Sequence, residues 1–515
     1  MAHSVPKLLS AELEGINAEL VEVEADLNVG LHSFNIVGLA DKAVSEAKER
    51  VNSALKNSGI KPPSKENRRI TVNLAPADTK KAGSRFDLPI ALAYLLASDQ
   101  IASFPTRDRL FVGELSLDGS LRPVTGVLSF AALAAERGIP LLFVPKANAE
   151  EAAIARNVTV IPVSTLTELV GHLEGKSVIA PQPPTAIAPK IPISLQSIAD
   201  IKGQGSAKRA LLIAAAGGHN LLMSGPPGTG KTMLAEALAS ILPPPSLEET
   251  LEITKIWSAA GLTLNAPYIA WRPFRAPHHN ASTVAVIGGG GTPKPGEISL
   301  AHRGVLFMDE LPEFHRDVLE GLRQPLESGT VHVARSKKTL VFPARFMLVA
   351  AMNPCPCGYY GDTAKECTCT AHEVVRYKKK ISGPLLDRID LQITVPRIPI
   401  EELRAERMGD PDAEEARVRE TVTRARRTQA ERFAATDPKV WCNAEMSSAK
   451  TDELIRLTQE AERTLKDMIE RSFVSARGYY RILKVSRTIA DIEGSADVNK
   501  EHIAEAFHYR LKEGE

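Results

Sequence analysis

Three runs of apolar residues in the middle of the chain predict the buried strands of a parallel sheet. Leu221–Met223, Val305–Met308 and Phe346–Met352 are each continuously apolar, without the alternation of a half-exposed strand. Strands that are covered on both faces have this pattern, which is typical of α/β folds. Each run ends in polar or glycine-rich sequence. We therefore expect the three strand ends to lie together at one edge of the sheet, where open α/β sheets bind their ligands.

Proline-rich and charged stretches divide the rest of the chain. Residues 179–195, IAPQPPTAIAPKIPISL, lack helical periodicity and predict an extended, partly stiff linker. A weaker break at 395–406 precedes charged, helical sequence that continues to the end of the chain. A length of 515 residues is enough for about three domains. We predict an N-terminal domain at 1–178, an α/β core at 196–398 and an all-α domain at 399–515.

Composition excludes several classes of protein. The chain is 43% hydrophobic and 24% charged, and its net charge of +1 limits any nucleic-acid-binding surface to a local patch. The first thirty residues contain acids where a signal peptide needs an apolar core, and no segment reaches the roughly 18 apolar residues of a membrane span. We therefore expect a cytoplasmic protein whose cysteines stay reduced.

The most specific chemical motif is GPPGTGKT, which follows the first apolar run. Its glycines let backbone amides close around phosphate oxygens, and a helix begins at the lysine. Lys231 is predicted to reach the β- and γ-phosphates of ATP, and the Thr232 hydroxyl to hold Mg²⁺. The complete pattern in a strand-loop-helix setting argues against a plain Gly-Pro turn. The predicted nucleotide-binding residues are Gly225, Pro226, Pro227, Gly228, Thr229, Gly230, Lys231 and Thr232.

Polar side chains follow the other two strands. Asp309 and Glu310 come directly after Val305–Met308, and Asn353 ends the run FMLVAAMN. In a P-loop ATPase the aspartate orders the Mg²⁺ shell, and the glutamate polarises the attacking water. Asn353 could bind the γ-phosphate or that water, although spacing alone leaves an Asn-Pro turn as an alternative.

Four of the five cysteines lie in one short loop, CPCGYYGDTAKECTC. Cys355 and Cys357 form one C-x-C pair, and Cys367 and Cys369 form another. The intervening residues are long enough to bring four thiolates around a tetrahedral ion. We predict a structural zinc site with these four ligands, in which His372 could replace one cysteine. Unligated burial is the alternative, but a loop this polar offers little core. Cys442 stands apart and is predicted to serve in packing.

The motifs together carry a family resemblance. From about residue 196 onward the chain resembles AAA+ ATPases of the magnesium-chelatase subunit type, relatives of the MCM helicases, most specifically in RPFRAPHHNASTVAVIGGGGTPKPGEISLAHRGVLFMDELPEF. With its N-terminal half, the whole chain is similar to the ComM/YifB-like, magnesium-chelatase-like family. The resemblance implies a homo-hexameric ring with ATP sites between subunits. It also implies a DNA helicase that drives branch migration during recombination in natural transformation, on branched or single-stranded DNA without sequence specificity.

The same resemblance assigns roles to individual residues. Asn353 matches the sensor-1 residue, Arg388 matches the arginine that reaches the γ-phosphate of a neighbouring subunit, and Arg477 matches the sensor-2 arginine of a helical lid. An arginine suits the second role because its fixed charge offsets transition-state charge on the transferred phosphoryl group. The alternative for Arg388 is a surface ion pair with Asp387 or Asp390, and Arg477 could be a solvated charge at a helix start.

Residues 327–346 predict a β-hairpin with a basic tip. In the helicase relatives a pore hairpin stands at this place, so Arg335, Lys337 and Lys338 are predicted to contact DNA phosphates. A charge run is more often a solvated loop. Residues 284–295, with four consecutive glycines, resemble the family's other pore insertion. A second function stays open, an AAA+ remodeller of a protein partner, as in the magnesium-chelatase motor subunits.

Residues 113–152, together with the run KKAGSRFDLPIALAYLLAS, are similar to the proteolytic domain of Lon, an α+β fold shared with ribosomal protein S5. That chemistry needs a serine and a lysine base, but Arg85 and Leu128 stand at those positions, and Ser84 has no lysine at the partner position. We therefore expect a Lon-like domain without protease activity. Its basic residues could form a DNA-contact surface or be ordinary solvated charges: Lys65, Arg68, Arg69, Lys80, Lys81 and Arg85.

Overall fold

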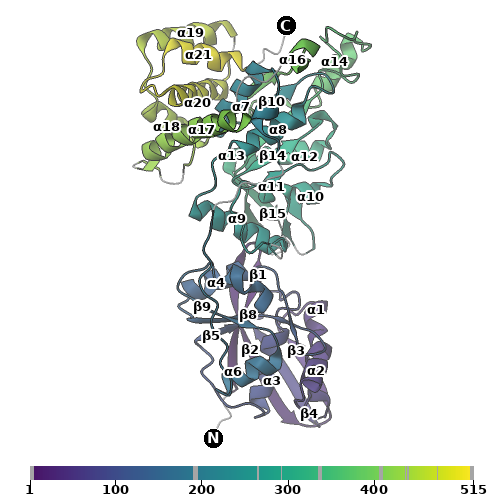
Figure 1. Ribbon diagram of the computed structural model, residues 1–515. Coiled ribbons are helices and arrows are strands. Elements are labelled where there is room, and N and C mark those ends of the chain that lie inside the picture. Colours follow the sequence, from purple (N-terminus) through teal and green to yellow (C-terminus); the bar gives the residue numbers. More distant parts are fainter. Residues whose placement is uncertain are drawn as a thin grey trace. The chain divides into compact units, whose positions relative to one another are not determined.

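The computed structural model describes residues 5–65, 67–188, 195–263, 266–291, 293–334, 339–404, 410–434, 436–437, 440–472 and 474–510 (Figure 1). They form two compact units. The first unit holds the described residues within 1–188, 247–269 and 335–340, and the second holds the remainder. Among the described residues, no helix combines the length and apolarity needed to cross a membrane.

The first unit is built on a mixed seven-stranded sheet in the order β3-β4-β2-β1-β5-β8-β9. Strand β2 pairs antiparallel with β1 and β4, whereas β3/β4, β1/β5, β5/β8 and β8/β9 are parallel pairs. A short ribbon, β6 with β7, lies outside this sheet. The strands are β1 (Lys7–Glu14), β2 (Asn17–Val29), β3 (Ser33–Val37), β4 (Arg68–Ala75), β5 (Arg109–Phe111), β6 (Glu114–Leu115), β7 (Leu121–Arg122), β8 (Leu141–Pro145) and β9 (Thr159–Val163).

Helix α3 forms the centre of the first unit's core. Its sequence DLPIALAYLLA is apolar on every side, and a helix of that kind is buried all round. The helices of this unit are α1 (Lys42–Ser45), α2 (Ala47–Asn57), α3 (Asp87–Ala97), α4 (Val127–Glu136), α5 (Ala149–Ala152), α6 (Leu166–Leu173) and α9 (Leu247–Ala260). The unit therefore combines helices with a mixed sheet, and its predicted likeness to the α+β domain of Lon stays a prediction.

The second unit contains a parallel five-stranded sheet in the order β11-β14-β17-β10-β18. This confirms the predicted α/β core with a parallel sheet. Every residue of β14 and β17 is buried, which explains their unbroken apolar sequence. The five strands are β10 (Leu221–Ser224), β11 (Phe274–Arg275), β14 (Val305–Met308), β17 (Met347–Met352) and β18 (Leu391–Thr394).

Helices and two small ribbons complete the second unit. The ribbons pair β12 (Gly288–Gly289) with β13 (Lys294–Pro295), and β15 (Thr330–Ala334) with β16 (Thr339–Pro343), of which the first two residues are counted with the first unit. The helices up to the last strand are α7 (Gly205–Gly217), α8 (Lys231–Ser240), α10 (Thr283–Ile287), α11 (Glu297–Leu300), α12 (Arg316–Gly321), α13 (Pro325–Ser328), α14 (Ala371–Lys378) and α15 (Gly383–Leu386).

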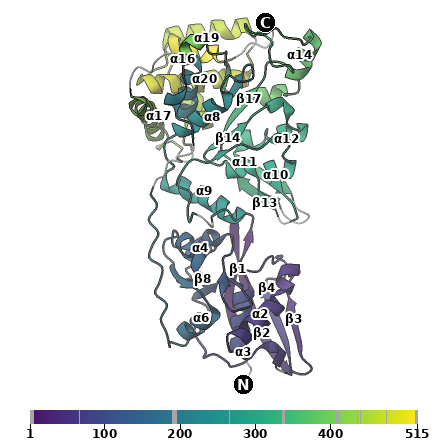
Figure 2. The same cartoon turned by 45° about the vertical axis from the view of Figure 1, so that its right-hand side comes forward.

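The regular elements described after β18 are all helices, in agreement with the charged, periodic sequence there. They form α16 (Ile400–Arg404), α17 (Pro411–Ala434), α18 (Ser448–Leu454), α19 (Gln459–Ser472), α20 (Ala476–Glu493) and α21 (Lys500–His508). Helices α17 to α21 gather in one cluster, drawn in green to yellow, and α17 and α20 both pack against α7 (Figures 1 and 2). Their role as a lid stays a prediction.

Candidate functional site

The carboxyl ends of three neighbouring strands meet at one edge of the parallel sheet. Strand β17 lies between β14 and β10, with Met308 opposite Ala350 and Ser224 opposite Met352. The backbone N–H of Gly225 donates to the carbonyl of Met352 at 3.2 Å. The predicted nucleotide loop, the acidic pair after β14 and Asn353 therefore all leave the sheet at the same edge.

Glycine is required in the loop at two places for different reasons. A Cβ atom at Gly225 would lie 2.2 Å from the carbonyl oxygen of Val395, so only glycine fits beside β18. Gly230 has a φ of +81° and directly precedes α8. Because Gly230 has no side chain to cap that helix, the N–H groups of the first turn are available to an anion.

Lys231 places its ammonium group inside the loop. Its Nζ donates to the carbonyls of Gly225 at 2.8 Å and Pro226 at 2.9 Å, and lies 3.4 Å from Oδ1 of Asn353. Burial lowers the pKa of Lys231 below its usual value, whereas the charges of Asp309 and Glu310 act to raise it. The lysine, the loop carbonyls and Asn353 therefore form one polar cluster, consistent with a shared phosphate site.

Two oxygen atoms at this edge fit a magnesium ion. Oγ1 of Thr232 lies 3.3 Å from Oδ2 of Asp309. Bonds of about 2.05 Å in an octahedron place neighbouring oxygen ligands about 2.9 Å apart. A hydroxyl and a carboxylate at this separation could occupy adjacent positions around Mg²⁺ after a small adjustment, which is the role predicted for both residues.

Glu310, the predicted polariser of water, is paired with a histidine. Its Oε2 lies 3.2 Å from Nδ1 of His279, and half of the Glu310 side chain is exposed. Glu310 itself adopts the left-handed conformation, with a φ of +52°. The ring of His279 also lies against that of His278, tilted by 34° with centroids 4.2 Å apart. No local sequence signal gives His279 this role, because its contact with Glu310 joins separate parts of the chain.

Arg388 and Arg477 converge on one carboxylate. NH2 of Arg388 bonds Oε2 of Glu327, and NH2 of Arg477 lies 3.2 Å from Oε1 of the same residue. The hydrogen bond from Arg388 is the main cause that lowers the pKa of Glu327. Arg388 is 7% exposed, so its predicted alternative as a surface ion pair is wrong. The part played by Glu327 was not predicted, since no motif marks it.

The carboxylates proposed as alternative partners of Arg388 have other contacts. Asp390 bonds NH1 of Arg481 and lies 3.5 Å from Nδ1 of His219, while Asp387 lies 3.8 Å from Arg510. Asn220, which precedes β10, binds the carbonyl of Arg388 at 2.9 Å. Arg388 therefore lies at the amino end of the strands, opposite the end that carries the nucleotide loop.

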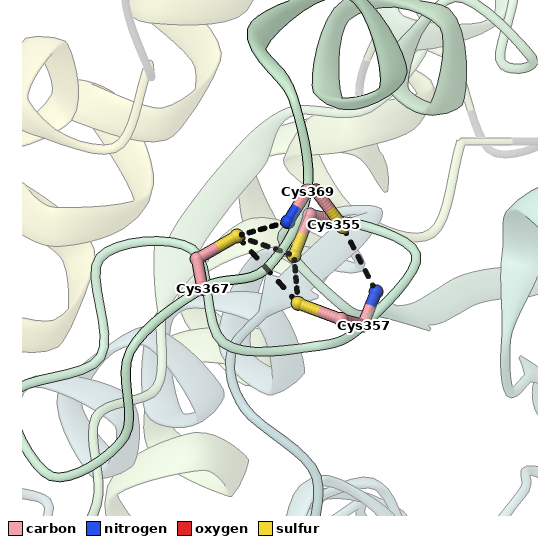
Figure 3. Close-up of side chains that lie close together, drawn as sticks. All are labelled: Cys355, Cys357, Cys367 and Cys369. Atoms are coloured by element: carbon pink, nitrogen blue, oxygen red, sulfur yellow. Dashed lines mark hydrogen bonds between the residues drawn. The ribbon is translucent and has the colours of Figure 1, made fainter.

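The four clustered cysteines bring their sulfur atoms together (Figure 3). Cys355 Sγ lies 3.4 Å from Cys357 Sγ and 3.7 Å from Cys367 Sγ, and all four sulfur atoms lie within 4.8 Å of one another. Bonds of about 2.3 Å to a tetrahedral ion place sulfur atoms about 3.8 Å apart. The set therefore fits zinc, and the exposed His372 is not needed as a ligand.

The predicted DNA contacts are described only in part. Arg335, Lys337 and Lys338 lie outside the described residues, between the two strands of the β15/β16 ribbon. The other predicted insertion consists of α10 followed by the β12/β13 ribbon. The placement of basic side chains toward DNA stays a prediction.

Two of the basic residues proposed for an N-terminal contact surface are not exposed. Lys81 is fully buried, with its Nζ bonded to the carbonyl of Pro76. Arg85 lies 3.3 Å from Glu12 and 5.5 Å above the ring of Phe130. Lys81 therefore cannot serve in such a surface, and Arg85 is largely engaged within the domain. Ser84 donates to Glu114, and the backbone N–H of Leu128 donates to Glu151 at 3.0 Å.

Comparisons with known proteins agree with this site. Three family models match, described as magnesium chelatase, subunit ChlI (residues 197–403), subunit ChlI of Mg-chelatase (23–148), and magnesium chelatase, subunit ChlI C-terminal (413–510). The chain is 45% identical over 501 residues to competence protein ComM of Haemophilus influenzae, covering 96% of this chain and 95% of that protein. It is 42% identical over 497 residues to the uncharacterized protein YifB of Escherichia coli, covering 96% and 95%. A shorter match, 31% over 161 residues, covers 30% of this chain and 23% of the magnesium-chelatase 67 kDa subunit of Chlorobaculum parvum.

Proposed function

Because this chain belongs to the magnesium-chelatase-like family that contains ComM and YifB, we propose that it is an ATP-driven motor acting on DNA. The motor is a hexameric helicase that promotes branch migration during recombination in natural transformation. One observation carries the proposal: near-full-length similarity to a competence protein accompanies an intact nucleotide edge formed by Lys231, Thr232, Asp309 and Asn353.

ATP hydrolysis follows from the groups at that edge. The first turn of α8 and Lys231 hold the phosphates, and Thr232 with Asp309 would hold Mg²⁺, which offsets charge on the phosphates when bound. Glu310 orients and polarises the attacking water once its carboxylate leaves His279. Asn353 donates its amide to the γ-phosphate or to that water.

Arginines from a neighbouring subunit complete the site in this proposal. Arg388 precedes β18 and the nucleotide loop follows the parallel strand β10, so at least the four residues of β10 separate them along the sheet. At about 3.3 Å per residue that length keeps Arg388 from its own chain's phosphates. Glu327 binds both Arg388 and Arg477 and so holds them close together. In the proposed ring, both arginines would contact the nucleotide of the next subunit.

The test is ATP hydrolysis and junction dissociation by purified wild-type protein, with Lys231→Ala as the inactive control. We expect four-way-junction DNA to stimulate phosphate release severalfold, and the junction to separate only with hydrolysable ATP. Replacing Lys337 and Lys338 by alanine should preserve basal hydrolysis and abolish the DNA response, since those charges are proposed to bind phosphate. A wild-type protein that hydrolyses ATP without any DNA response would refute the DNA motor.

A second candidate function is an ATP-driven remodeller of a protein partner. It is favoured by the family models, which are all of the magnesium-chelatase subunit ChlI, and by the match to a magnesium-chelatase subunit over 161 residues. DNA-independent hydrolysis that rises only on addition of a protein fraction would support it over the DNA motor.

A further inference from the structure

The cysteine loop has the internal hydrogen bonds of a metal-thiolate site. Backbone N–H groups of Tyr360, Cys369 and Cys357 donate to the sulfur atoms of Cys355, Cys367 and Cys369 at 3.3, 3.4 and 3.4 Å. Such bonds stabilise negative charge on sulfur and orient metal ligands. Sγ of Cys357 also lies 3.5 Å from Sγ of Cys367.

Neither disulfide bonding nor core packing accounts for the cluster. The sulfur separations exceed the roughly 2.05 Å of a disulfide, and all four cysteines are free. Cys355 is fully buried, but the other three are partly exposed in a loop of polar residues, so they do not fill a core. Four convergent thiols at tetrahedral spacing are explained by a shared ion.

A bound ion would restrict the shape of the loop. Between Met352 and Ala371, a stretch whose residues are all described, the chain forms no α-helix or β-strand. Arg397 pairs with Asp362 of the loop at 2.8 Å, a contact in which the carboxylate is buried and the arginine is partly exposed. A metal that closes the loop would remove much of its conformational freedom.

The loop lies directly against the nucleotide site. Gly358, at a φ of +89°, approaches so closely that a Cβ atom there would lie 2.8 Å from Cδ of Pro227 and 4.0 Å from Cγ of Asn353. Pro227 is part of the phosphate loop, and Cys355 is two residues from Asn353. The backbone N–H of Gly358 also donates to the carbonyl of Cys355 at 3.0 Å. The turn from Cys355 to Gly358 therefore connects the thiolates to the backbone that lies against Pro227 and Asn353.

We propose that Cys355, Cys357, Cys367 and Cys369 bind one Zn²⁺, and that the zinc-held loop fixes Pro227 and Asn353 in the arrangement that binds nucleotide. The ion is structural, because four protein thiolates leave no open coordination position. The coupling rests on the proposed ATP-binding function. Loss of zinc should therefore weaken nucleotide binding although no zinc ligand touches the nucleotide.

The experiment measures zinc per chain by mass spectrometry and the affinity for a fluorescent ATP analogue with Mg²⁺. Four full-length proteins are compared: wild type, a double variant that carries both Cys367→Ser and Cys369→Ser, Gly358→Ala, and the control Thr368→Ser. Thr368 is exposed and lies between two of the proposed ligands. We expect one zinc in wild type, Gly358→Ala and Thr368→Ser, and none in the double cysteine variant. Circular dichroism checks that each variant is folded.

Measurements of nucleotide binding then distinguish the effect of the metal from the effect of the contact between Gly358 and Pro227. The double cysteine variant, and wild type stripped with a zinc-selective chelator, should bind the analogue about tenfold or more weakly, and added zinc should restore only the stripped wild type. Gly358→Ala should retain zinc yet bind about tenfold more weakly, since its Cβ atom displaces Pro227. Thr368→Ser should match wild type.

Different results would overturn the metal site and the coupling to nucleotide binding. Zinc near zero in wild type overturns the metal site, and a stripped wild type or a Gly358→Ala protein that binds nucleotide as tightly as loaded wild type overturns the coupling. Failure of the ATP proposal gives a different result: zinc-loaded wild type and Lys231→Ala would bind the analogue equally poorly. That result also overturns the coupling, while the zinc content still decides the metal site by itself.

Discussion

His279 Nδ1 lies 3.2 Å from Glu310 Oε2, so the carboxylate expected to polarise water is paired with a side chain from another segment. A carboxylate in such a pair is less free to accept a proton from water. His279 lies four residues before the start of α10, which packs against α12 after Glu310. This gives the predicted DNA insertion a physical connection to the glutamate predicted to polarise water.

The first prediction is that His279→Ala raises hydrolysis measured without DNA. A histidine–carboxylate contact this exposed is worth roughly 0.5 to 1 kcal/mol, so release of Glu310 should raise the basal rate about two- to fivefold. Phosphate release at saturating ATP measures it. In the Glu310→Gln background the same change should have no effect. A large fall in the rate would mean that His279 positions Glu310 rather than restraining it.

The second prediction concerns Arg388, which lies at the opposite end of the strands from Lys231. Arg388→Ala should retain nucleotide binding and lower hydrolysis by about 10³-fold or more, whereas Lys231→Ala should lose binding itself. Mixing the two inactive proteins should recover some activity, because some interfaces then pair an intact loop with an intact arginine. Absence of recovery between subunits that demonstrably exchange would argue for action within one chain.

The third prediction is that Glu310→Gln separates binding from hydrolysis. The amide keeps the shape of the side chain but cannot act as a base, so hydrolysis should fall by about 10² to 10⁴-fold while nucleotide binding persists. The variant should accumulate as a nucleotide-dependent hexamer that holds four-way-junction DNA without separating it. Analytical ultracentrifugation and gel assays test the two parts, and a variant that stays monomeric with bound nucleotide would contradict the ring.

The fourth prediction concerns stability at the junction of the sheet and helix α20. Burial acts to raise the pKa of Asp390, but the charge of Arg481 and the contacts with His219 and the N–H of Asn220 prevail and lower it below its usual range. Asp390→Asn should lower the free energy of unfolding by about 3 to 5 kcal/mol, because it leaves Arg481 without its charge partner. Urea unfolding followed by circular dichroism measures the change.

The pH dependence of that stability has a definite sign. A carboxyl group with a lowered folded-state pKa stabilises the fold above the unfolded value of about 3.9, and this contribution is lost as the pH falls through the folded value. Wild type should therefore lose stability below about pH 4 more steeply than Asp390→Asn. Asp387→Asn, at a more exposed neighbour, is the control and should change the free energy of unfolding by less than about 0.5 kcal/mol.

The sequence alone determined the centre of the site, because its signals are local. A phosphate loop needs contiguous residues with particular backbone freedom, and continuous apolar runs identify strands covered on both faces. The rule that parallel strands expose their carboxyl ends at one edge then placed Lys231, Asp309 and Asn353 together. Two closely spaced C-x-C pairs likewise predicted convergent thiols, since a short loop limits how far they can separate.

Only the tertiary structure decided which distant groups touch. Glu327 as the shared partner of Arg388 and Arg477, His279 against Glu310, and Gly358 against Pro227 each join residues that no local pattern relates. Charge in a sequence also does not reveal burial: Lys81 is enclosed in the core because its ammonium group is satisfied by a backbone carbonyl. Pairing of this kind depends on the packing of whole elements, which becomes fixed only when the sheets and helices assemble.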